Sequence, residues 1–415
     1  MNVTGIIAEY NPFHNGHFYH LQEARKQTNA DYLIVVMSGC FLQRGVPAIV
    51  DKHTRAEMAL LSGADLVLEL PVPFATGSAE FFAAGGIRLL AASGVVNRVC
   101  YGMEEETTSL LNDAAALLTS PTPSFDRTVA DLVKQGMSCP RARQEALIAA
   151  LPQYPADEVR AFLSKPNNIL ALEYEKAILR QNAEDNGSLC GLGIRRIGDG
   201  YHETDIKSRY ASATAIRNLL LQPEFPDDQL AFALPPHCLS LLKQTSDRSL
   251  LMDTDDFSEA LYARLLHLQP SGYIGFMDCT ESISRRIAEH VNEFISFSQF
   301  ADLVKTKDIT RTRANRVLTH ILLDLRTEDY TDPTVHYLRV LGFARRAEPL
   351  LSEIHKKASA PLLTKVADAS RNLSVPAMQA LKRDMFAADL YRGVSRIKSG
   401  LILSGEYNTP ITIPL

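Results

Sequence analysis

Two histidines flank an asparagine and a glycine near the start of the chain, in the string His14-Asn15-Gly16-His17. This string follows an apolar stretch, residues 3–8, and leads into a segment of helical periodicity, residues 18–28. A glycine lets the backbone approach phosphate oxygens, a helix N-terminus offers unpaired N–H groups, and imidazoles can donate to developing charge. The pattern predicts a nucleotide phosphate site and favours adenylyl transfer from ATP.

Two other interpretations of these histidines remain open. One of them could simply cap the helix. His14, His17 and His20 also recur every three residues, as metal ligands can, but no cysteine or carboxylate is arranged beside them to complete a zinc site. We therefore predict no metal site here.

A second segment with phosphate-binding character begins at residue 211. Ser212 and Thr214 stand in the first turn of a predicted helix, and Arg217 lies about one turn inside it. Hydroxyl and N–H groups there can hold phosphates, and an arginine can neutralise the charge that builds on pyrophosphate. Alone the segment is an ordinary helix start, but with His14 and His17 it predicts a two-part triphosphate site.

A third polar stretch, residues 37–52, follows the second predicted strand. Its Gln43-Arg44 and Asp51-Lys52 pairs can reach an anion or a nucleotide, although the two basic residues could equally be solvated loop charges. Cys40 in the same stretch is better explained as a packed small residue than as a nucleophile.

The elements that must position these residues alternate between strands and helices. Apolar stretches predict four strands, a later segment at 190–197 predicts one more, and amphipathic segments predict the intervening helices. This order is typical of a Rossmann-like α/β fold, a parallel sheet with helices on both faces, whose ligands sit beyond the carboxyl ends of the strands. The first strands are expected at 3–8, 32–37, 66–70 and 95–101, and the helices at 18–28, 54–62, 78–93 and 107–118.

The rest of the chain is mainly helical in pattern. Helices at 125–150 and 156–180 predict an insertion over the sheet, at about 120–185, and little strand signal appears after residue 226 before residues 401–413. We predict a nucleotidyltransferase-like, ATP-binding domain at 1–225 and a mainly helical domain at 226–415. Helices of the second domain are expected at 258–267, 282–294, 313–325 and 346–357.

Composition sets wider bounds. The 415 residues are 46% hydrophobic, which is enough for a sizeable core, and the net charge of −5 means that any nucleic acid must be held by a local basic patch. Six cysteines without a Cys-x-x-Cys pair argue against a zinc ribbon and a disulfide framework. No apolar run is long enough for a membrane span, so we expect a cytoplasmic protein of unspecified oligomeric state.

The His-x-Gly-His and Ser-x-Thr-x-x-Arg strings together resemble the nucleotidyltransferase superfamily related to class I aminoacyl-tRNA synthetases. The longer strings resemble one family in particular, the bacterial tRNA(Met) cytidine acetate ligases, through the whole α/β portion and less sharply beyond it. They are AEYNPFHNGH at 8–17, FLQRG at 41–45, PAIVDK at 47–52, PNNIL at 166–170, GYH at 200–202 and ASATAIR at 211–217.

The resemblance implies an enzyme that activates acetate with ATP, with Mg²⁺ and no organic cofactor, to acetyl-adenylate. The acetyl group then passes to N4 of the wobble cytidine of elongator tRNA(Met). It implies catalytic roles for His14, His17 and Arg217. The implied ATP contacts are Ile7, Ala8, Glu9, Tyr10, Asn11, Pro12, Phe13, His14, Asn15, Gly16, His17, Phe18, Tyr19, His20, Gly102, Asn167, Asn168, Arg195, Arg196, Ser212 and Thr214.

Two details of this resemblance stay open. The sequence does not decide between Asn167 and Asn168, or between Arg195 and Arg196, as the ATP contact. The chain also departs from the family pattern, with Cys40 where an asparagine is expected and His53 where a tryptophan is common.

An enzyme of this kind must also bind RNA, which needs positive charge. Five basic residues fall within twelve positions of the helical domain, although a solvated helix face would show the same pattern. We name this set the basic strip: Lys305, Lys307, Arg311, Arg313 and Arg316.

Two other functions fit part of the pattern. A cofactor adenylyltransferase acting on a small phosphorylated acceptor would use the same phosphate site, but the helical domain and basic strip favour RNA. A tRNA-binding protein without catalysis would not need His14, His17 and Arg217 together.

Overall fold

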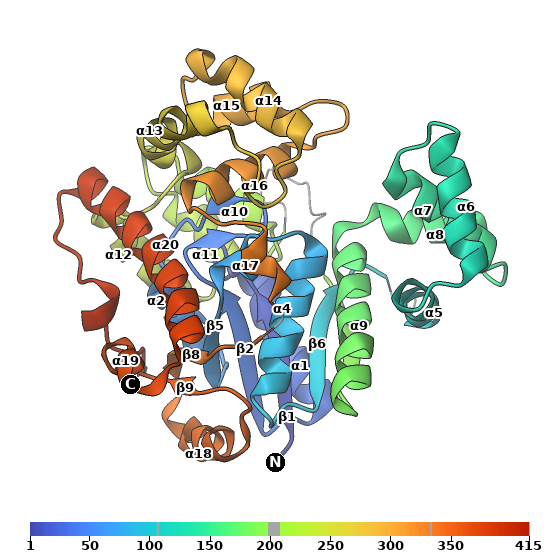
Figure 1. Cartoon of the computed structure of the whole chain (residues 1–415). Helices are drawn as coiled ribbons and strands as arrows, with labels where there is room; N and C mark the ends of the chain where they lie inside the picture. The colour runs from blue at the N-terminus through green and yellow to red at the C-terminus, as the bar shows by residue number, and fades with distance from the viewer. Residues whose placement is uncertain (106–107, 198–207, 333, 415) are drawn as a thin grey trace.

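The structure is a computed structural model that describes residues 1–105, 108–197, 208–332 and 334–414. The GYH string at 200–202 lies outside these ranges. Figure 1 shows a central sheet, a helical region over one end of it, and a small helical lobe to one side.

Seven strands form the central sheet, in the order β7-β6-β1-β2-β5-β8-β9. The first five in that order run parallel, β8 pairs antiparallel with β5, and β9 pairs parallel with β8. A separate antiparallel hairpin, whose strands β3 and β4 have two residues each, follows β2. The strands are β1 (Val3–Ala8), β2 (Tyr32–Ser38), β3 (Phe41–Leu42), β4 (Val46–Pro47), β5 (Leu66–Leu70), β6 (Arg98–Met103), β7 (Cys190–Arg195), β8 (Leu338–Phe343) and β9 (Leu362–Leu363).

Both faces of the sheet are buried, because its strands are nearly continuous apolar runs. Along β2, Leu33 and Val35 pack into one hydrophobic core, and Ile34 and Val36 pack into another on the opposite face. This alternation is the period of two expected for a strand, and it requires a helical layer on each side. The predicted Rossmann-like fold is therefore confirmed.

Two sets of helices supply these layers. One face is covered by α1 (Asn15–Thr28), α2 (Lys52–Leu61), α10 (Ala213–Leu220), α11 (Asp227–Ala233) and α12 (Pro236–Asp247). The other is covered by α4 (Ala79–Ala92), α9 (Pro166–Asp185) and α18 (Glu348–Lys357), and α5 (Thr108–Thr119) packs on α9.

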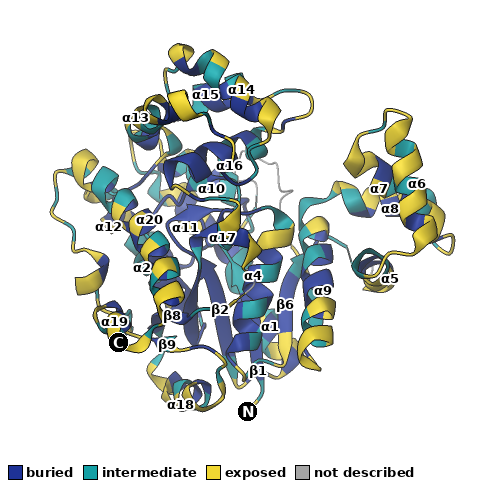
Figure 2. Cartoon of the chain, viewed as in Figure 1, coloured by how far each residue is buried: buried dark blue, intermediate teal, exposed yellow. Residues whose placement is uncertain are grey.

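The lobe beside the sheet contains three short helices with exposed outer faces (Figures 1 and 2). The predicted helix at 125–150 is in fact two helices, interrupted by Gly136 at a φ of +89°. The predicted helix at 156–180 is likewise divided, before Pro166, and its second part, α9, packs on β6 rather than in the lobe. The lobe comprises α6 (Pro123–Lys134), α7 (Cys139–Ala150) and α8 (Ala156–Ser164).

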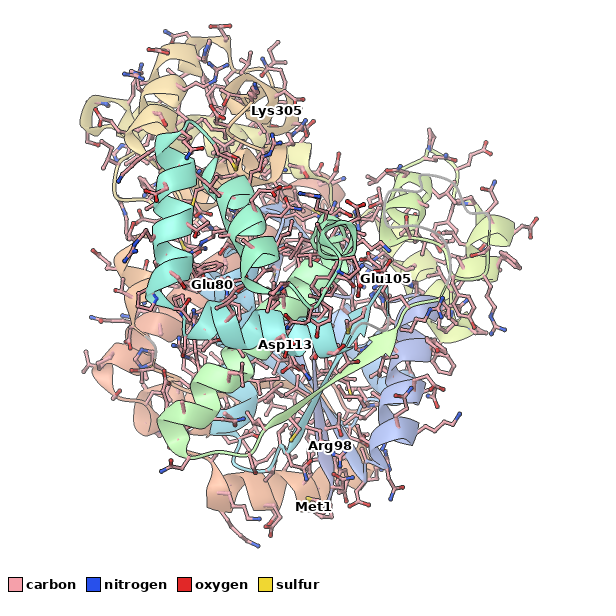
Figure 3. The ribbon with its side chains drawn as sticks, turned by 90° about the vertical axis from the view of Figure 1, so that its right-hand side faces the viewer. Met1, Glu80, Arg98, Glu105, Asp113 and Lys305 are labelled. Carbon is pink, nitrogen blue, oxygen red and sulfur yellow. The ribbon has the colours of Figure 1, made fainter. Side chains whose placement is uncertain are left out.

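The second half of the chain is mostly helical, and its helices between residues 258 and 322 lie above the carboxyl ends of the strands (Figure 1). In Figure 3, Arg98 at the start of β6 lies low, Glu105 just beyond its end lies higher, and Lys305 marks the helical region at the top. The helices are α13 (Ser258–Leu268), α14 (Glu281–His290), α15 (Phe297–Val304), α16 (Arg311–Leu322), α17 (Glu328–Thr331), α19 (Ala369–Asn372) and α20 (Val375–Ser399), while α3 (Val72–Ala75) follows β5. No described helix is long and apolar enough to cross a membrane.

The second half of the chain is mainly helical, as predicted, but it also contributes two short strands that its sequence pattern did not indicate. Strands β8 and β9 return from the helical half to extend the sheet beside β5. The segment 401–413 instead makes an isolated bridge, between Thr412 and Gly342. The proposed division into two domains at residue 225 stays a prediction, but the sheet itself takes strands from both sides of that point.

Buried ion pairs join the returning strand to the sheet. Lys52 on α2 lies 2.8 Å from Glu69 on β5 and 3.0 Å from Glu406 near the C-terminus, and Arg339 on β8 contacts both carboxylates. All four side chains are buried, so removing one would leave an uncompensated charge, which costs about 3–5 kcal/mol.

Candidate active site

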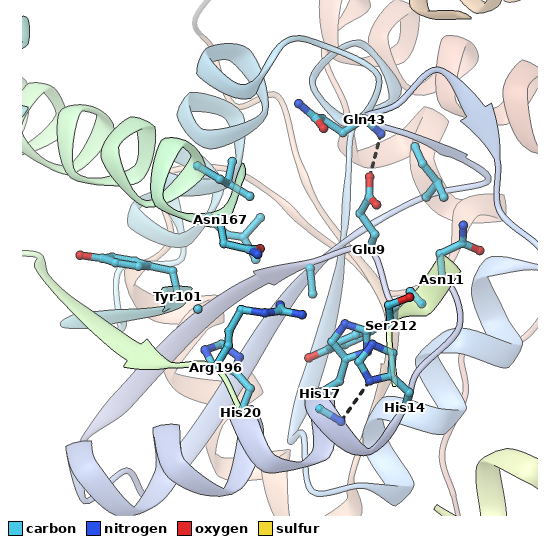
Figure 4. A pocket seen from close by; sticks show the side chains of 18 of the residues that line it. Glu9, Asn11, His14, His17, His20, Gln43, Tyr101, Asn167, Arg196 and Ser212 are labelled. Atoms are coloured by element: carbon cyan, nitrogen blue, oxygen red, sulfur yellow. Dashed lines mark hydrogen bonds between the residues drawn. The ribbon is translucent and has the colours of Figure 1, made fainter. Parts of the chain in front are cut away.

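A pocket opens where the order of the strands reverses, between the carboxyl ends of β1 and β6 (Figure 4). This switch point is where open α/β sheets bind ligands. Most of the predicted ATP contacts line it. They are Ile7, Ala8, Glu9, Tyr10, Asn11, His14, Gly16, His17, Tyr19, His20, Gly102, Asn167, Arg195, Arg196, Ser212 and Thr214. Arg217, predicted to be catalytic, lines the pocket as well.

His14 is the N-cap of α1, and it also faces the pocket. Its Nδ1 accepts a hydrogen bond of 3.0 Å from the Gly16 amide, so in the neutral ring the proton lies on Nε2. A Cβ at position 16 would lie 2.8 Å from the His14 ring, which explains the glycine. Because the Gly16 N–H is bonded to the His14 ring, it is not available to phosphate. The His14 Nε2–H remains as a donor.

The two motif histidines form a neutral, stacked pair. The His14 and His17 rings lie 3.8 Å apart between centroids at 29°. Loss of hydration, and then the charges of Arg196 and Arg217, lower the pKa of His14 to about 3, and loss of hydration also lowers the pKa of His17 well below its usual value. Both rings are therefore uncharged at neutral pH and act as hydrogen-bond donors rather than as cations.

The predicted helix start at Ser212 is confirmed, since Ser212 caps α10 by accepting from the Ala215 amide at 3.0 Å. Arg217 on the same helix donates to the Asn11 carbonyl at 2.8 Å and to the Thr214 hydroxyl at 3.1 Å. These bonds fasten α10 to the loop between β1 and α1. The two parts of the predicted triphosphate site therefore meet in one pocket.

Five predicted ATP contacts do not line the pocket: Pro12, Phe13, Asn15, Phe18 and Asn168. Asn15 instead donates to the carbonyls of Arg209 and Phe232, at 3.2 and 3.1 Å, and so holds the motif against α11. Phe13 is buried against Tyr10. These residues support the loop that carries the contacts.

The open choice between the two asparagines has a structural answer. Asn168 is buried and its Oδ1 accepts from the Glu104 amide at 3.0 Å, whereas Asn167 lines the pocket and donates to Glu104 Oε1 at 2.7 Å. Arg195 and Arg196 both line the pocket, and Figure 4 shows Arg196 directed toward the histidines. Asn167 and Arg196 are the better candidates for ATP contacts.

The β3–β4 hairpin closes another side of the pocket. Gln43 and Arg44 line it, as the sequence predicted for this stretch. Asp51 and Lys52 do not: Asp51 caps α2, and Lys52 is enclosed in the buried ion pairs with Glu69. The prediction that this pair faces an anion is therefore wrong.

Sequence reasoning missed an apolar wall opposite the hairpin. Phe82, Tyr101, Leu170 and Tyr174 line the pocket from α4, β6 and α9, and the two tyrosine rings stack at 5.7 Å. In the sequence these residues look like ordinary core positions of strands and helices. They face the pocket because of how α4, β6 and α9 are oriented around it, and only the folded structure shows that orientation.

Sequence reasoning also missed Arg55, which is fully buried beneath the pocket. Its guanidinium donates to the carbonyls of Glu9 at 2.6 Å, Ser38 at 3.1 Å, Val50 at 3.1 Å and also Gly39. One side chain therefore holds together the loops that follow β1 and β2.

The basic strip begins at the C-cap of α15, passes through the following loop and continues along α16, and its three arginines have partners. Arg311 pairs with Asp302, Arg316 Nε lies 2.7 Å from Asp278 Oδ2, and Arg313 donates to the Asp278 carbonyl at 3.2 Å. Lys305 and Lys307 are exposed. The strip adjoins the pocket through the hairpin, because Gly45 packs against the backbone of Arg316.

A metal held by the protein alone finds little support. Within the described residues, no group of three or more histidines, cysteines or carboxylates could hold an ion. Glu9 is the one carboxylate among the described residues that line the pocket. Mg²⁺ could still arrive with ATP, since it commonly bridges phosphates and keeps several waters.

A family model described as HIGH Nucleotidyl Transferase matches residues 1–400. The fold and the pocket around His14 and His17 accordingly define the chain as a nucleotidyltransferase of the HIGH type.

Full-length relatives narrow this class. The tRNA(Met) cytidine acetate ligase of Acetivibrio thermocellus is 34% identical over 402 residues, covering 94% of each chain, and that of Clostridium kluyveri is 36% identical over 421 residues, covering 100% of this chain and 99% of its own. Two crystal structures of Thermotoga maritima TmcAL, one apo and one bound with alpha-thio ATP, align with TM-scores of 0.92 and 0.89 at 30% identity over 100% of this chain and 99% of theirs. The chain belongs to the tRNA(Met) cytidine acetate ligase family.

Proposed function

We propose that this protein activates acetate with ATP and transfers the acetyl group to N4 of the wobble cytidine of elongator tRNA(Met), in the cytoplasm. The observation that carries the proposal is the meeting of His14, His17 and Arg217 in one pocket at the switch point of the sheet. The names of the full-length relatives, and the alpha-thio ATP bound in the Thermotoga maritima structure, support the same reaction.

In the activation step, acetate attacks the α-phosphorus of ATP and pyrophosphate leaves. The neutral His14 and His17 donate hydrogen bonds to the phosphoryl oxygens, and Arg217 meets the charge that builds on pyrophosphate. Ser212 and Thr214 add hydroxyls at the start of α10, and Asn167 and Arg196 contact the remainder of the nucleotide. Mg²⁺, where present, would be held by the phosphates of ATP and by water.

In the transfer step, the wobble cytidine leaves the anticodon stack and enters the pocket from the side of the hairpin. Bound RNA needs cations for its phosphates, and the exposed Lys305 and Lys307 are the proposed contacts of the basic strip. Arg311, Arg313 and Arg316 shape the surface beside them.

Exchange of labelled pyrophosphate into ATP tests the activation step. We expect exchange that depends on acetate, followed by formation of N4-acetylcytidine when tRNA(Met) is added. Nucleoside analysis of tRNA from cells with and without the protein tests the whole reaction. Exchange without any dependence on a small carboxylate, or unchanged acetylcytidine in cells lacking the protein, would contradict the proposal.

A further inference from the structure

Glu9 occupies an unexpected position in a pocket otherwise suited to anions. Arg44, Arg195, Arg196 and Arg217 line this pocket, whereas Glu9 is its one carboxylate among the residues that the structure describes. Figure 4 shows Glu9 between the histidine pair on one side and Asn167 and Gln43 on the other. A carboxylate set against the ATP phosphates would repel them, so Glu9 is better suited to a neutral reacting group.

The structure fixes this carboxylate from two directions. Glu9 Oε1 accepts a hydrogen bond from the backbone N–H of Gln43 at 2.8 Å. The backbone carbonyl of Glu9 accepts one from the buried guanidinium of Arg55 at 2.6 Å. Within the described ranges, Oε2 makes no hydrogen bond or ion pair. One oxygen therefore orients the group, and the other is left to accept a proton.

The proposed transfer step needs a proton acceptor. The lone pair of the cytidine N4 amine is delocalised into the ring, so the amine is a weak nucleophile unless a base removes a proton as it attacks. Other pocket groups serve poorly as that base. His14 Nδ1 already accepts from Gly16, and loss of hydration lowers the pKa of His14 to about 3, that of His20 to about 4 and that of His17 well below its usual value. Burial raises the pKa of the Tyr174 hydroxyl and keeps it protonated.

The position of Glu9 also agrees with the entry side of the RNA. Gln43, which holds the carboxylate, belongs to the hairpin that packs against α16 and hence adjoins the basic strip. A base entering over that hairpin meets Glu9 before it meets the histidines. The pocket thus offers a proton acceptor on its RNA side and phosphate donors on its ATP side.

We propose that Glu9 is the catalytic base of acetyl transfer, an inference that rests on the proposed function. As N4 attacks the carbonyl carbon of acetyl-adenylate, one N4 proton moves to Glu9 Oε2 and the new N–C bond forms. The C–O bond to the α-phosphate then breaks, and AMP leaves with that electron pair on its phosphate. Glu9 afterwards releases the proton to water.

The substitution Glu9→Gln tests this role, because an amide oxygen can still accept from the Gln43 amide but cannot take the proton. We expect single-turnover transfer from preformed acetyl-adenylate to tRNA(Met) to fall by about 10²- to 10⁴-fold. Acetate-dependent pyrophosphate exchange should fall by a much smaller factor. Glu57→Gln, on α2 and outside the lining of this pocket, is the matched control and should behave as wild type in both assays.

Either of two results would overturn the inference while wild type remains active: equal losses of exchange and transfer, which would place Glu9 in activation, or undiminished transfer. Absence of exchange and transfer in wild type would instead contradict the proposed function. If Glu9→Gln does not fold, Glu9→Asp decides, because a shortened carboxylate should slow transfer more than exchange. Thermal unfolding of each variant checks the fold.

Discussion

The pocket and the basic strip are both rich in arginine, but the described bonds of their arginines differ in kind. In the pocket, Arg217 donates to a carbonyl and a hydroxyl, both neutral. On the strip, Arg311 and Arg316 pair with Asp302 and Asp278. These two bonds fix Arg217 on the loop after β1 and on its own helix, whereas the bonds of the two strip arginines to aspartates compensate their charge.

The difference indicates two kinds of recognition. A fixed cation beside neutral histidines is preorganised for phosphates whose positions barely change from one turnover to the next. A surface with compensated arginines and exposed lysines suits a large partner that binds and leaves, because exposed pairs are weak and are screened by salt. Four predictions, from the largest expected effect to the smallest, test this comparison.

His14→Ala should lower acetate-dependent pyrophosphate exchange by about 10²- to 10³-fold, because the donor to the phosphoryl group is lost. His14→Asn is the informative companion, since asparagine is a good N-cap and keeps α1 stable. We expect a similar loss of exchange with an unchanged melting temperature. Recovery of activity in His14→Asn would mean that His14 acts only as a cap.

Arg217→Lys should lower exchange by about 10- to 100-fold, because lysine keeps the charge but cannot hold both Asn11 and Thr214 in the planar geometry of the guanidinium. Thr214→Val removes one of these acceptors and leaves the arginine, so its effect should be smaller. Steady-state kinetics with varied ATP would measure both variants, and equal effects would argue that the contact with Thr214, rather than the one with Asn11, accounts for the loss.

Lys305→Ala combined with Lys307→Ala should weaken tRNA binding and reduce its dependence on salt. Two lost phosphate contacts lower the slope of log affinity against log salt by roughly 1.4 to 1.8. Arg311→Ala should change that slope less, because Asp302 already compensates the charge. Filter binding across a salt series would measure this, and a larger effect of Arg311 would reverse the distinction drawn between the two regions.

Stability should fall in mild acid. The folded-state pKa of His14, about 3, lies below the unfolded value of 6.5, so between these values the unfolded chain binds the extra proton. The contribution is complete above pH 6.5 and is lost as pH falls toward 3, at up to about 1.4 kcal/mol per pH unit. Denaturant unfolding of the ligand-free protein at several pH values should show a shallower dependence for His14→Asn, and identical slopes would refute a buried neutral histidine.

Much of the ATP side could be predicted from the sequence. The limits of β1 and β5 coincide with the predicted strands, because unbroken apolar runs bounded by polar turns leave little choice. The motif around His14 and the helix start at Ser212 also lie where their local chemistry placed them. In these segments the structure favoured by the local sequence is also the one that packs in the folded protein.

Other features depend on contacts that a single sequence does not display. The run at Leu338–Phe343 is only six residues long and is flanked by helical patterns, so its pairing with β5 was not visible. Asn167 and Asn168 are neighbours on α9, and only the orientation of that helix decides that Asn167 faces the pocket and Asn168 is buried. Arg55 looks like a surface residue of an amphipathic helix, yet it is buried because four carbonyls satisfy its guanidinium.

The pairing of β5 with β8 has a consequence for the synthesis of the chain. Leu338 follows Leu70 by 268 positions (338 − 70), so the ribosome must translate for roughly 15 to 55 seconds before the neighbour of β5 exists. During that interval β5 presents an open hydrogen-bonding edge, which other strands can capture. A newborn chain is therefore most vulnerable to aggregation before residue 338 emerges, and a pause in translation within the helical half would prolong that exposure.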